Sequence, residues 1–324
     1  RTLAMRTLLS PLLLVAAFLP MMGGVPVIQK PGGEGQGSET AKPIPTPLPV
    51  VIWHGMGDTC CLPISMGSIK KRIEEAVPGV YVNSLMIGDN VAQDQYNGYL
   101  MPIAKQLDLA CKIVADDGAL QGGFHAVGFS QGGLFLRALV QTCPAAKVFN
   151  LVSIGGPQQG IFGIPKCTNA NNTLCETMRA LLELGAYNPL VQDRLVQAQY
   201  WHDPVASVRY ASDNVFLPGV NGDAGGRNET HAARIAALRT LVLVKFTGDT
   251  VVVPRDSEWF GFYGPDGKGI VGLEDQPMYK EDWIGLRALD EGGRLVRLES
   301  PGDHLAMPPG YFQDKIIPYL SQPL

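Results

Sequence analysis

The segment from Phe124 to Val140 constrains the fold of this chain more than any other. Residues 128–132, Gly-Phe-Ser-Gln-Gly, fit the G-x-S-x-G nucleophile elbow, in which a serine stands on a sharp turn between a strand and a helix. The apolar run 124–129 predicts a buried parallel strand, and the spacing after the turn fits one helix face, with Leu134, Leu136, Leu139 and Val140. Strand, turn and helix together favour an elbow over the alternative, a serine in an ordinary glycine turn.

Further apolar runs predict strands that alternate with helices. Strands are expected at 50–53, 81–87, 149–154, 241–246 and 295–298, and helices at 64–77, 99–114, 131–142 and 313–320. This alternation indicates a mostly parallel central sheet with helices on both faces. Between about 157 and 239, short helical stretches (174–184 and 190–200) replace the strands. The fold class expected is therefore an α/β-hydrolase fold with a mainly helical insertion over the active site.

The region before the first strand reads as a leader and a linker. Residues 1–24 carry Arg1 and Arg6 ahead of about a dozen apolar residues, which is typical of a secretory signal peptide, with a signal anchor as the alternative. Residues 25–48 are rich in Pro and Gly and show no hydrophobic periodicity, as in a linker. The hydrolase domain is expected to cover 49–324.

A serine hydroxyl needs a histidine to take its proton and a carboxylate to orient that histidine. In α/β-hydrolases the order along the chain is Ser, then Asp or Glu, then His. After Ser130, Asp249 immediately follows the core strand 241–246, and His304 follows the strand 295–298. Asp256 and Asp303 are nearby alternatives to Asp249, which we prefer because it directly follows a core strand.

Composition excludes other classes of function. The chain has 46% hydrophobic and 17% charged residues and a net charge of −4, and no cluster of Lys or Arg stands out, so nothing indicates a nucleic-acid partner. Its five histidines form no metal-ligand pattern such as H-E-x-x-H. We therefore expect no metal and no cofactor.

Several stretches of the sequence resemble the palmitoyl-protein thioesterase family, from about residue 48 to the end of the chain. The most specific is Asp-Ser-Glu-Trp-Phe-Gly-Phe-Tyr at 256–263. The others are 51–58 with Cys60 and Cys61 behind it, 128–133, 192–198, 200–204 and 302–305.

The resemblance implies a function and a set of site residues. Ser130 would be the nucleophile, Asp249 the orienting acid and His304 the base, in agreement with the order of residues. The backbone N–H groups of Met56 and Gln131 would form the oxyanion hole. An acyl-binding groove would include Val196, Trp201, Val251, Val252 and Pro254. The expected substrates are S-palmitoylated proteins or peptides and fatty acyl thioesters, with transient contact with a lipid or membrane surface, in the lysosome or outside the cell.

The same resemblance implies how the cysteines pair. Six cysteines allow fifteen pairings by counting alone, and the family implies Cys60–Cys61, Cys111–Cys143 and Cys167–Cys175. Two sequons predict glycosylation at Asn171 and Asn228.

Two other functions remain open on the sequence. A secreted lipid esterase or lipase would use the same triad on oxygen esters, and neither fold nor triad separates the two activities. A non-catalytic secreted glycoprotein is the third hypothesis, and the intact Ser130, Asp249 and His304 argue against it.

Overall fold

The computed structural model describes residues 46–163 and 173–323. The predicted signal peptide and almost all of the predicted linker therefore lie outside the described residues. The description includes no helix with both the length and the apolar character needed to cross a membrane.

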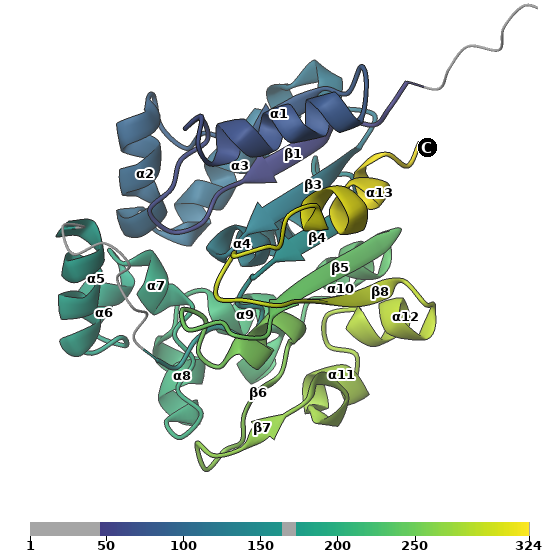
Figure 1. The fold of residues 1–324 in the computed structure, drawn as a ribbon. Helices are drawn as coiled ribbons and strands as arrows, with labels where there is room; N and C mark the ends of the chain where they lie inside the picture. Colours follow the sequence, from purple (N-terminus) through teal and green to yellow (C-terminus); the bar gives the residue numbers. More distant parts are fainter. Residues whose placement is uncertain (1–45, 164–172, 324) are drawn as a thin grey trace, which may run out of the picture. The chain divides into compact units, whose positions relative to one another are not determined.

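A six-stranded parallel sheet forms the centre of the fold, in the order β2-β1-β3-β4-β5-β8 (Figure 1). The strands are β1 (Val50–Trp53), β2 (Val82–Ser84), β3 (Phe124–Phe129), β4 (Val148–Ile154), β5 (Thr240–Phe246) and β8 (Leu295–Ser300). All neighbours pair in parallel, so the loops that follow the strands leave from one edge of the sheet. This confirms the predicted fold class.

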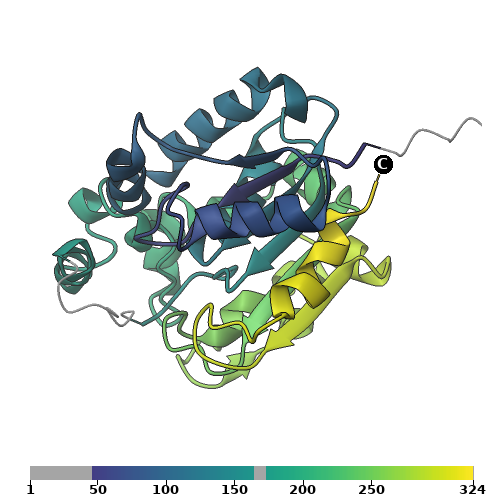
Figure 2. The same ribbon diagram turned by 45° about the horizontal axis from the view of Figure 1, so that its top comes forward.

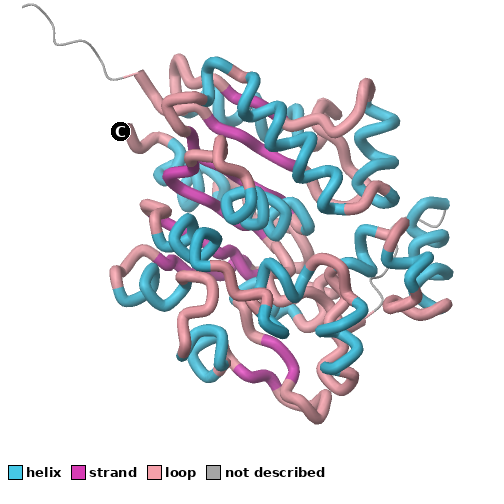
Figure 3. Tube along the Cα trace, turned by 180° about the vertical axis from the view of Figure 1, so that it is seen from behind, coloured by secondary structure: helices cyan, strands magenta, loops and turns pink. Residues whose placement is uncertain are grey.

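Alternate residues of each strand pack on opposite faces of the sheet, because successive side chains of a strand point to opposite sides. Val51 and Trp53 contact one hydrophobic cluster, whose helices include α3 (Ile103–Asp116) and α4 (Gln131–Thr142). Val50 and Ile52 contact the other cluster, with α1 (Met66–Ala76) and α13 (Ile317–Leu320). Figure 2 shows α1 and α13 over the same face, and Figure 3 shows helices over the opposite one. Both faces are covered, which is why the strands read as continuous apolar runs.

The prediction of one helix over 99–114 is wrong in where the helix begins. The structure has two helices, α2 (Val91–Leu100) and α3 (Ile103–Asp116), separated at Met101 and Pro102. Proline has no N–H to donate, and it holds the preceding residue in an extended conformation, seen at Met101 with φ −94° and ψ 126°. Helix α2 was not predicted at all.

Helices are the main regular elements in the described part of the predicted insertion. They are α5 (Thr173–Glu183), α6 (Pro189–Gln192), α7 (Val196–Gln199), α8 (Ser207–Asp213), α9 (Leu217–Asn221) and α10 (Glu229–Ala236). The predicted stretch 190–200 is thus two short helices. Met178, Leu182 and Leu195 share a cluster with Met56, so this region packs beside the loop that follows β1.

The remaining elements lie near the C-terminus. A two-stranded hairpin, β6 (Phe262–Tyr263) and β7 (Ile270–Val271), was not predicted. The short helices there are α11 (Pro277–Lys280) and α12 (Leu286–Glu291). A 3₁₀ turn, η3 (Arg255–Trp259), follows β5, and a π-helical turn, η5 (Phe312–Ile316), leads into α13.

Candidate active site

Ser130 stands on a sharp turn between β3 and α4. Its backbone has φ 54° and ψ −128°, a conformation rare outside glycine, and its N–H donates to the Ile154 carbonyl at 2.8 Å. A Cβ at Gly128 would lie 2.2 Å from the Gly132 carbonyl oxygen, so the turn can close this tightly only with glycine at position 128. The local sequence thus explains how the serine is raised above the sheet.

His304 lies between Ser130 and Asp249. Its Nε2 is 2.9 Å from Ser130 Oγ, and its Nδ1 is 2.5 Å from Asp249 Oδ2. Asp249 follows β5 and His304 follows β8, which are neighbouring strands. The structure therefore brings together the three side chains that the sequence selected, in a chain of hydrogen bonds that can move a proton off the serine.

The two alternative acids have other partners. Asp256 lies 3.4 Å from Lys245 Nζ. Asp303 accepts hydrogen bonds from the Thr250 N–H at 2.8 Å and from its own neighbour, the His304 N–H, at 2.8 Å. Neither carboxylate has a hydrogen bond with the imidazole ring, whereas Asp249 contacts its Nδ1.

Asp249 is held as a carboxylate by its hydrogen bonds. Burial acts to raise its pKa, but hydrogen bonds with His304 and Glu258, and from the Val252 N–H, outweigh burial and lower the pKa below its ordinary value. Its Oδ1 accepts from the Val251 and Val252 N–H groups at 2.7 and 2.8 Å. The side chain is thus fixed on both oxygens.

Glu258, which the sequence analysis did not single out, lies beside this pair. One potential ligand atom from each of Asp249, Glu258 and His304 lies within 4.8 Å of the others, which makes them the candidate metal-binding group among the described residues. Both ring nitrogens of His304, however, already have hydrogen-bond partners, Nδ1 with Asp249 and Nε2 with Ser130. A signal was available: Glu258 is part of the motif 256–263.

The loop that follows β1 lies against the serine. A Cβ at Gly55 would be 3.0 Å from Ser130 Cβ. Across residues 46–163 and 173–323, neither the Met56 nor the Gln131 N–H donates to a backbone carbonyl. The Gln131 side chain donates to the Gly98 carbonyl at 3.0 Å, which fixes the first residue of α4. The two residues predicted for the oxyanion hole thus lie on the two segments that meet at Ser130, the loop after β1 and the start of α4.

Asp94 and His54 form a buried pair that holds the loop after β1 in place. Both side chains are fully buried, with His54 Nε2 3.3 Å from Asp94 Oδ1. Asp94 also accepts from Thr59 Oγ1 and from the Cys60 and Ile87 N–H groups at 2.7 to 2.8 Å. His54 therefore contacts Asp94 in the buried base of this turn and has no contact with Ser130 Oγ, which pairs with His304.

We expect Asp94→Ala to lower the free energy of unfolding by about 3–5 kcal/mol, because it leaves several buried donors unpaired. Burial acts to raise the pKa of Asp94, but hydrogen bonds with His54 and with the Cys60 and Ile87 N–H groups lower it overall. The stabilisation is thus fully present above the unfolded pKa, about 3.9, and is lost as pH falls through the folded pKa. Urea unfolding at several pH values measures this. The difference in unfolding free energy between the original protein and Asp94→Ala should become smaller in acid. A difference that stayed constant would contradict the role of the ionised carboxylate.

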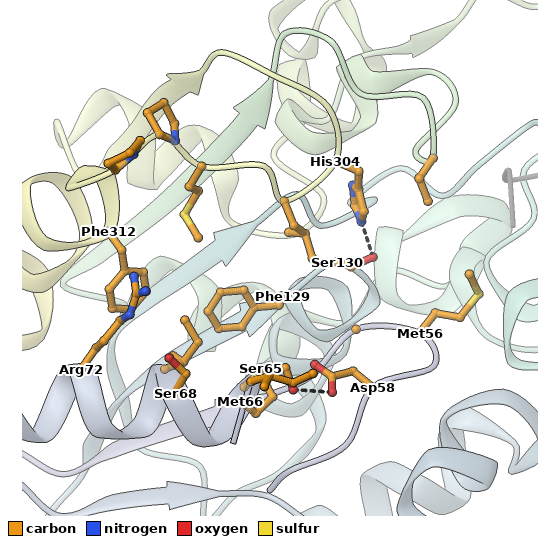
Figure 4. A pocket seen from close by; sticks show the side chains of 18 of the residues that line it. Met56, Asp58, Ser65, Met66, Ser68, Arg72, Phe129, Ser130, His304 and Phe312 are labelled. Carbon is orange, nitrogen blue, oxygen red and sulfur yellow. Dashed lines mark hydrogen bonds between the residues drawn. The ribbon is translucent and has the colours of Figure 1, made fainter. Parts of the chain in front are cut away.

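A pocket of about 730 Å³ opens at Ser130. Ser130, His304 and Met56 line one part of it, and Arg72 of α1 lines another (Figure 4). Ile69 of the same helix also lines the pocket. Apolar side chains dominate the space between, including Met66, Phe129, Leu305, Met307 and Phe312. The volume lies in the range typical of small-molecule sites.

Of the residues predicted for the acyl groove, Val251 lines this pocket. Val196 lines a separate cavity of about 10 Å³, next to Trp53 and Tyr200. Val252 is buried in the core, Pro254 is also buried, and Trp201 packs partly buried in the cluster that includes Met56. The structure therefore brings one of the five to the serine and leaves the other four outside this pocket.

Two of the three implied disulfides and one of the two sequons lie in the described residues. The structure joins Cys60 to Cys61 and Cys111 to Cys143, the pairs that the resemblance implies. Cys167 and the Asn171 sequon lie outside the described residues, as does the side chain of Cys175. Asn228 is exposed, as a glycan acceptor must be, and its Oδ1 caps α10 by accepting from the His231 N–H at 3.1 Å.

Comparison with known proteins finds similarity to thioesterases in both a family model and individual relatives. A family model described as palmitoyl protein thioesterase matches residues 49–304. The chain is 46% identical over 271 residues to palmitoyl-protein thioesterase 1 of Caenorhabditis elegans, covering 83% of this chain and 90% of that one. It is 33% identical over 280 residues to palmitoyl-protein thioesterase 3 of Dictyostelium discoideum, covering 84% and 92%. It is also 30% identical over 262 residues to lysosomal thioesterase PPT2 of Rattus norvegicus, covering 78% and 80%.

Proposed function

This chain belongs to the palmitoyl protein thioesterase family, and from that premise we propose that Ser130, His304 and Asp249 carry out its reaction. The protein is a thioesterase of the α/β-hydrolase fold. The substrate is a long-chain acyl group joined to cysteine in an S-acylated protein or peptide. The observation that carries the assignment is the chain of hydrogen bonds from Ser130 Oγ through His304 to Asp249.

The reaction has two halves. Ser130 Oγ attacks the thioester carbonyl carbon while His304 Nε2 takes its proton, and the C–S bond then breaks as the imidazolium returns a proton to the cysteine sulfur. Water next attacks the acyl-serine, His304 takes a proton from it, and the fatty acid leaves as Ser130 recovers its hydrogen. The Met56 and Gln131 N–H groups would stabilise the negative oxygen in both halves.

We place the acyl chain in the pocket along α1. Pocket residues from Ser65 to Arg72 span about 10 Å of that helix. The apolar lining favours methylene groups, each of which contributes about 0.8 kcal/mol when buried.

We expect palmitoyl thioesters to exceed lauroyl thioesters in kcat/KM by about a hundredfold to two-hundredfold, because four methylenes contribute roughly 3 kcal/mol. Ile69→Glu should remove most of this preference, because it puts a charge in the pocket. Val196→Ala should keep the preference, because Val196 lies in the separate cavity. The measurement is kcat/KM for a series of acyl chain lengths, each below its micelle-forming concentration. The opposite result, with Val196→Ala abolishing the preference, would place the acyl chain in the groove inferred from sequence.

The nearest alternative is a lipid esterase, which the same triad and an apolar pocket would also serve. Parallel assays of a palmitoyl thioester and its oxygen-ester analogue separate the two activities. Faster turnover of the oxygen ester would favour the esterase.

The remaining features of the proposal concern location and organisation. The lysosomal relative supports the lysosome as the location, and the cell exterior is the alternative that a signal peptide allows. The proposed organisation is residues 1–24 as signal peptide, 25–48 as linker and 49–324 as the thioesterase domain with its insertion at about 157–239. Ile64 lines the pocket and is 92% exposed, which supports transient contact with a lipid surface during acyl capture. Glycans at Asn171 and Asn228, and a third disulfide Cys167–Cys175, complete the proposal.

A further inference from the structure

Glu258 is a buried carboxyl group that the mechanism above does not use. It lies in η3 and is 1% exposed. Its Oε2 accepts a hydrogen bond from the Phe246 N–H at 2.8 Å. Its Oε1 is buried and accepts from no N–H or O–H donor within residues 46–163 and 173–323. A buried carboxylate oxygen without a donor is costly, so this atom calls for another explanation.

The explanation lies in the neighbouring carboxyl group. Glu258 and Asp249 each place an oxygen within 4.8 Å of the other and of a ring nitrogen of His304. Two carboxyl groups this close in a buried site do not both ionise, and one of them keeps a proton. Their hydrogen bonds decide which one.

Asp249 receives donors on both oxygens, from the Val251 and Val252 N–H groups and from His304. Glu258 receives a donor on one oxygen alone within the described structure. N–H donors stabilise the charged form of a carboxyl group. The charge therefore belongs on Asp249 and the proton on Glu258 Oε1, where it turns an acceptor without a partner into a donor.

The geometry points to Glu258 as a positioning residue, a protonated carboxyl group that donates its O–H to Asp249 and so leaves a single negative charge beside His304. This inference rests on the proposed function, because it concerns the same triad. With two charges beside it, the imidazole would hold its proton more tightly and would serve less well as a base. With one charge, Asp249 can stabilise the imidazolium while His304 is neutral at rest.

The other charged groups near Glu258 do not supply the missing donor. The charge of Lys245 of β5 acts on Glu258, but its Nζ lies 3.4 Å from Asp256, 3.8 Å from Glu299 of β8 and 3.9 Å from the centre of the Trp259 ring. Burial, followed by the hydrogen bond with Asp249 and its charge, raises the pKa of Glu258 to about 11, while the Phe246 N–H and Lys245 act to lower it. This agrees with the assignment from geometry.

Two substitutions test the role through the acidic limb of the kcat/KM profile, which reports protonation of the free enzyme's base. Glu258→Gln keeps a hydrogen-bond donor without a charge, so the limb should stay within about 0.3 pH units of the original. Glu258→Leu removes the donor and should move the limb to higher pH by about one unit and lower kcat at least about tenfold, since Asp249 then binds the imidazolium more tightly. Glu299→Gln is the matched control, because it removes an exposed carboxylate that pairs with the same Lys245 and should leave the limb in place.

A measurement independent of activity accompanies the profiles. The infrared difference spectrum between the original protein and Glu258→Gln at neutral pH should contain the C=O band of a protonated carboxyl group. If Glu258→Leu does not fold, as judged from its melting temperature, the Gln profile and the infrared band decide. Because the band does not require turnover, it also separates failure of this inference from failure of the triad assignment.

Four outcomes would overturn the inference. The first is a shift of the acidic limb of Glu258→Gln to lower pH by about 1–3 units, which is the shift that loss of a nearby negative charge produces. The second is a difference spectrum without the protonated band. The third is a folded Glu258→Leu variant with an unmoved limb. The fourth is loss of activity with a chelator and recovery with a divalent cation, which would assign Asp249, Glu258 and His304 to a metal instead.

Discussion

Ser130→Ala should lower kcat for a palmitoyl thioester by about 10⁴-fold or more, the scale of loss seen when serine hydrolases lose the nucleophile. Alanine provides no oxygen to form the acyl-enzyme, so only slow attack by water on a bound substrate remains. The measurement is single-turnover and steady-state hydrolysis by the purified variant.

The same variant should keep its fold. The Ser130 hydroxyl has His304 Nε2 as its hydrogen-bond partner, and alanine meets the same backbone constraint at φ 54° as serine does. The melting temperature should therefore change little. Ser212→Ala, on the exposed side of α8, is a matched control that removes a hydroxyl whose partner is Asp213 and which does not line the pocket at Ser130. Turnover by Ser130→Ala above a small fraction of the original rate would reject Ser130 as nucleophile.

Asp249→Asn should lower kcat by about 10⁴-fold, as loss of the triad carboxylate does in the best-studied serine protease. The amide keeps the shape of the side chain but not its charge. Its NH₂ can also face His304 Nδ1, which would hold the ring in the wrong tautomer with its proton directed at the serine. The imidazolium that forms during attack would lose its counter-charge.

Two neighbouring aspartates provide the controls for that experiment. Asp256→Asn removes a partner of Lys245, and Asp303→Asn weakens the hydrogen bonds that hold Thr250 and the His304 backbone. Each should cost no more than about tenfold, because an exposed or half-exposed pair contributes about 1 kcal/mol or less. Equal and mild losses at all three positions would show that Asp249 is not the orienting acid.

Sequence patterns were most informative where structure follows from neighbours along the chain. The strand 124–129 and the helix that ends at Thr142 match the structure, because a continuous apolar run and a helical spacing each report local geometry. Asp249 and His304 were found for a related reason. The carboxyl ends of parallel strands meet at one edge of a sheet, so residues that follow β5 and β8 come together once the sheet forms.

Prediction failed where the outcome depended on contacts between distant segments. Helix α2 was missed because it has a weak apolar face and is held by side-chain contacts such as that of Asp94 with the Cys60 N–H. The break between α2 and α3, in contrast, was indicated in the sequence by Pro102. The position of the pocket depended on α1 and on the segment around Phe312, which are far apart in the sequence.

Taken by itself, the sequence determined the sheet, the elbow, the order Ser-Asp-His and the family, because these follow from local periodicity and from motifs. Tertiary structure alone decided which apolar side chains face Ser130 and which lie in the core, as the contrast between Val251 and Val196 shows. It alone brought Glu258 beside Asp249. A carboxyl group's ionisation depends on its burial and on the donors around it, and those donors come from segments that meet only when the chain has folded.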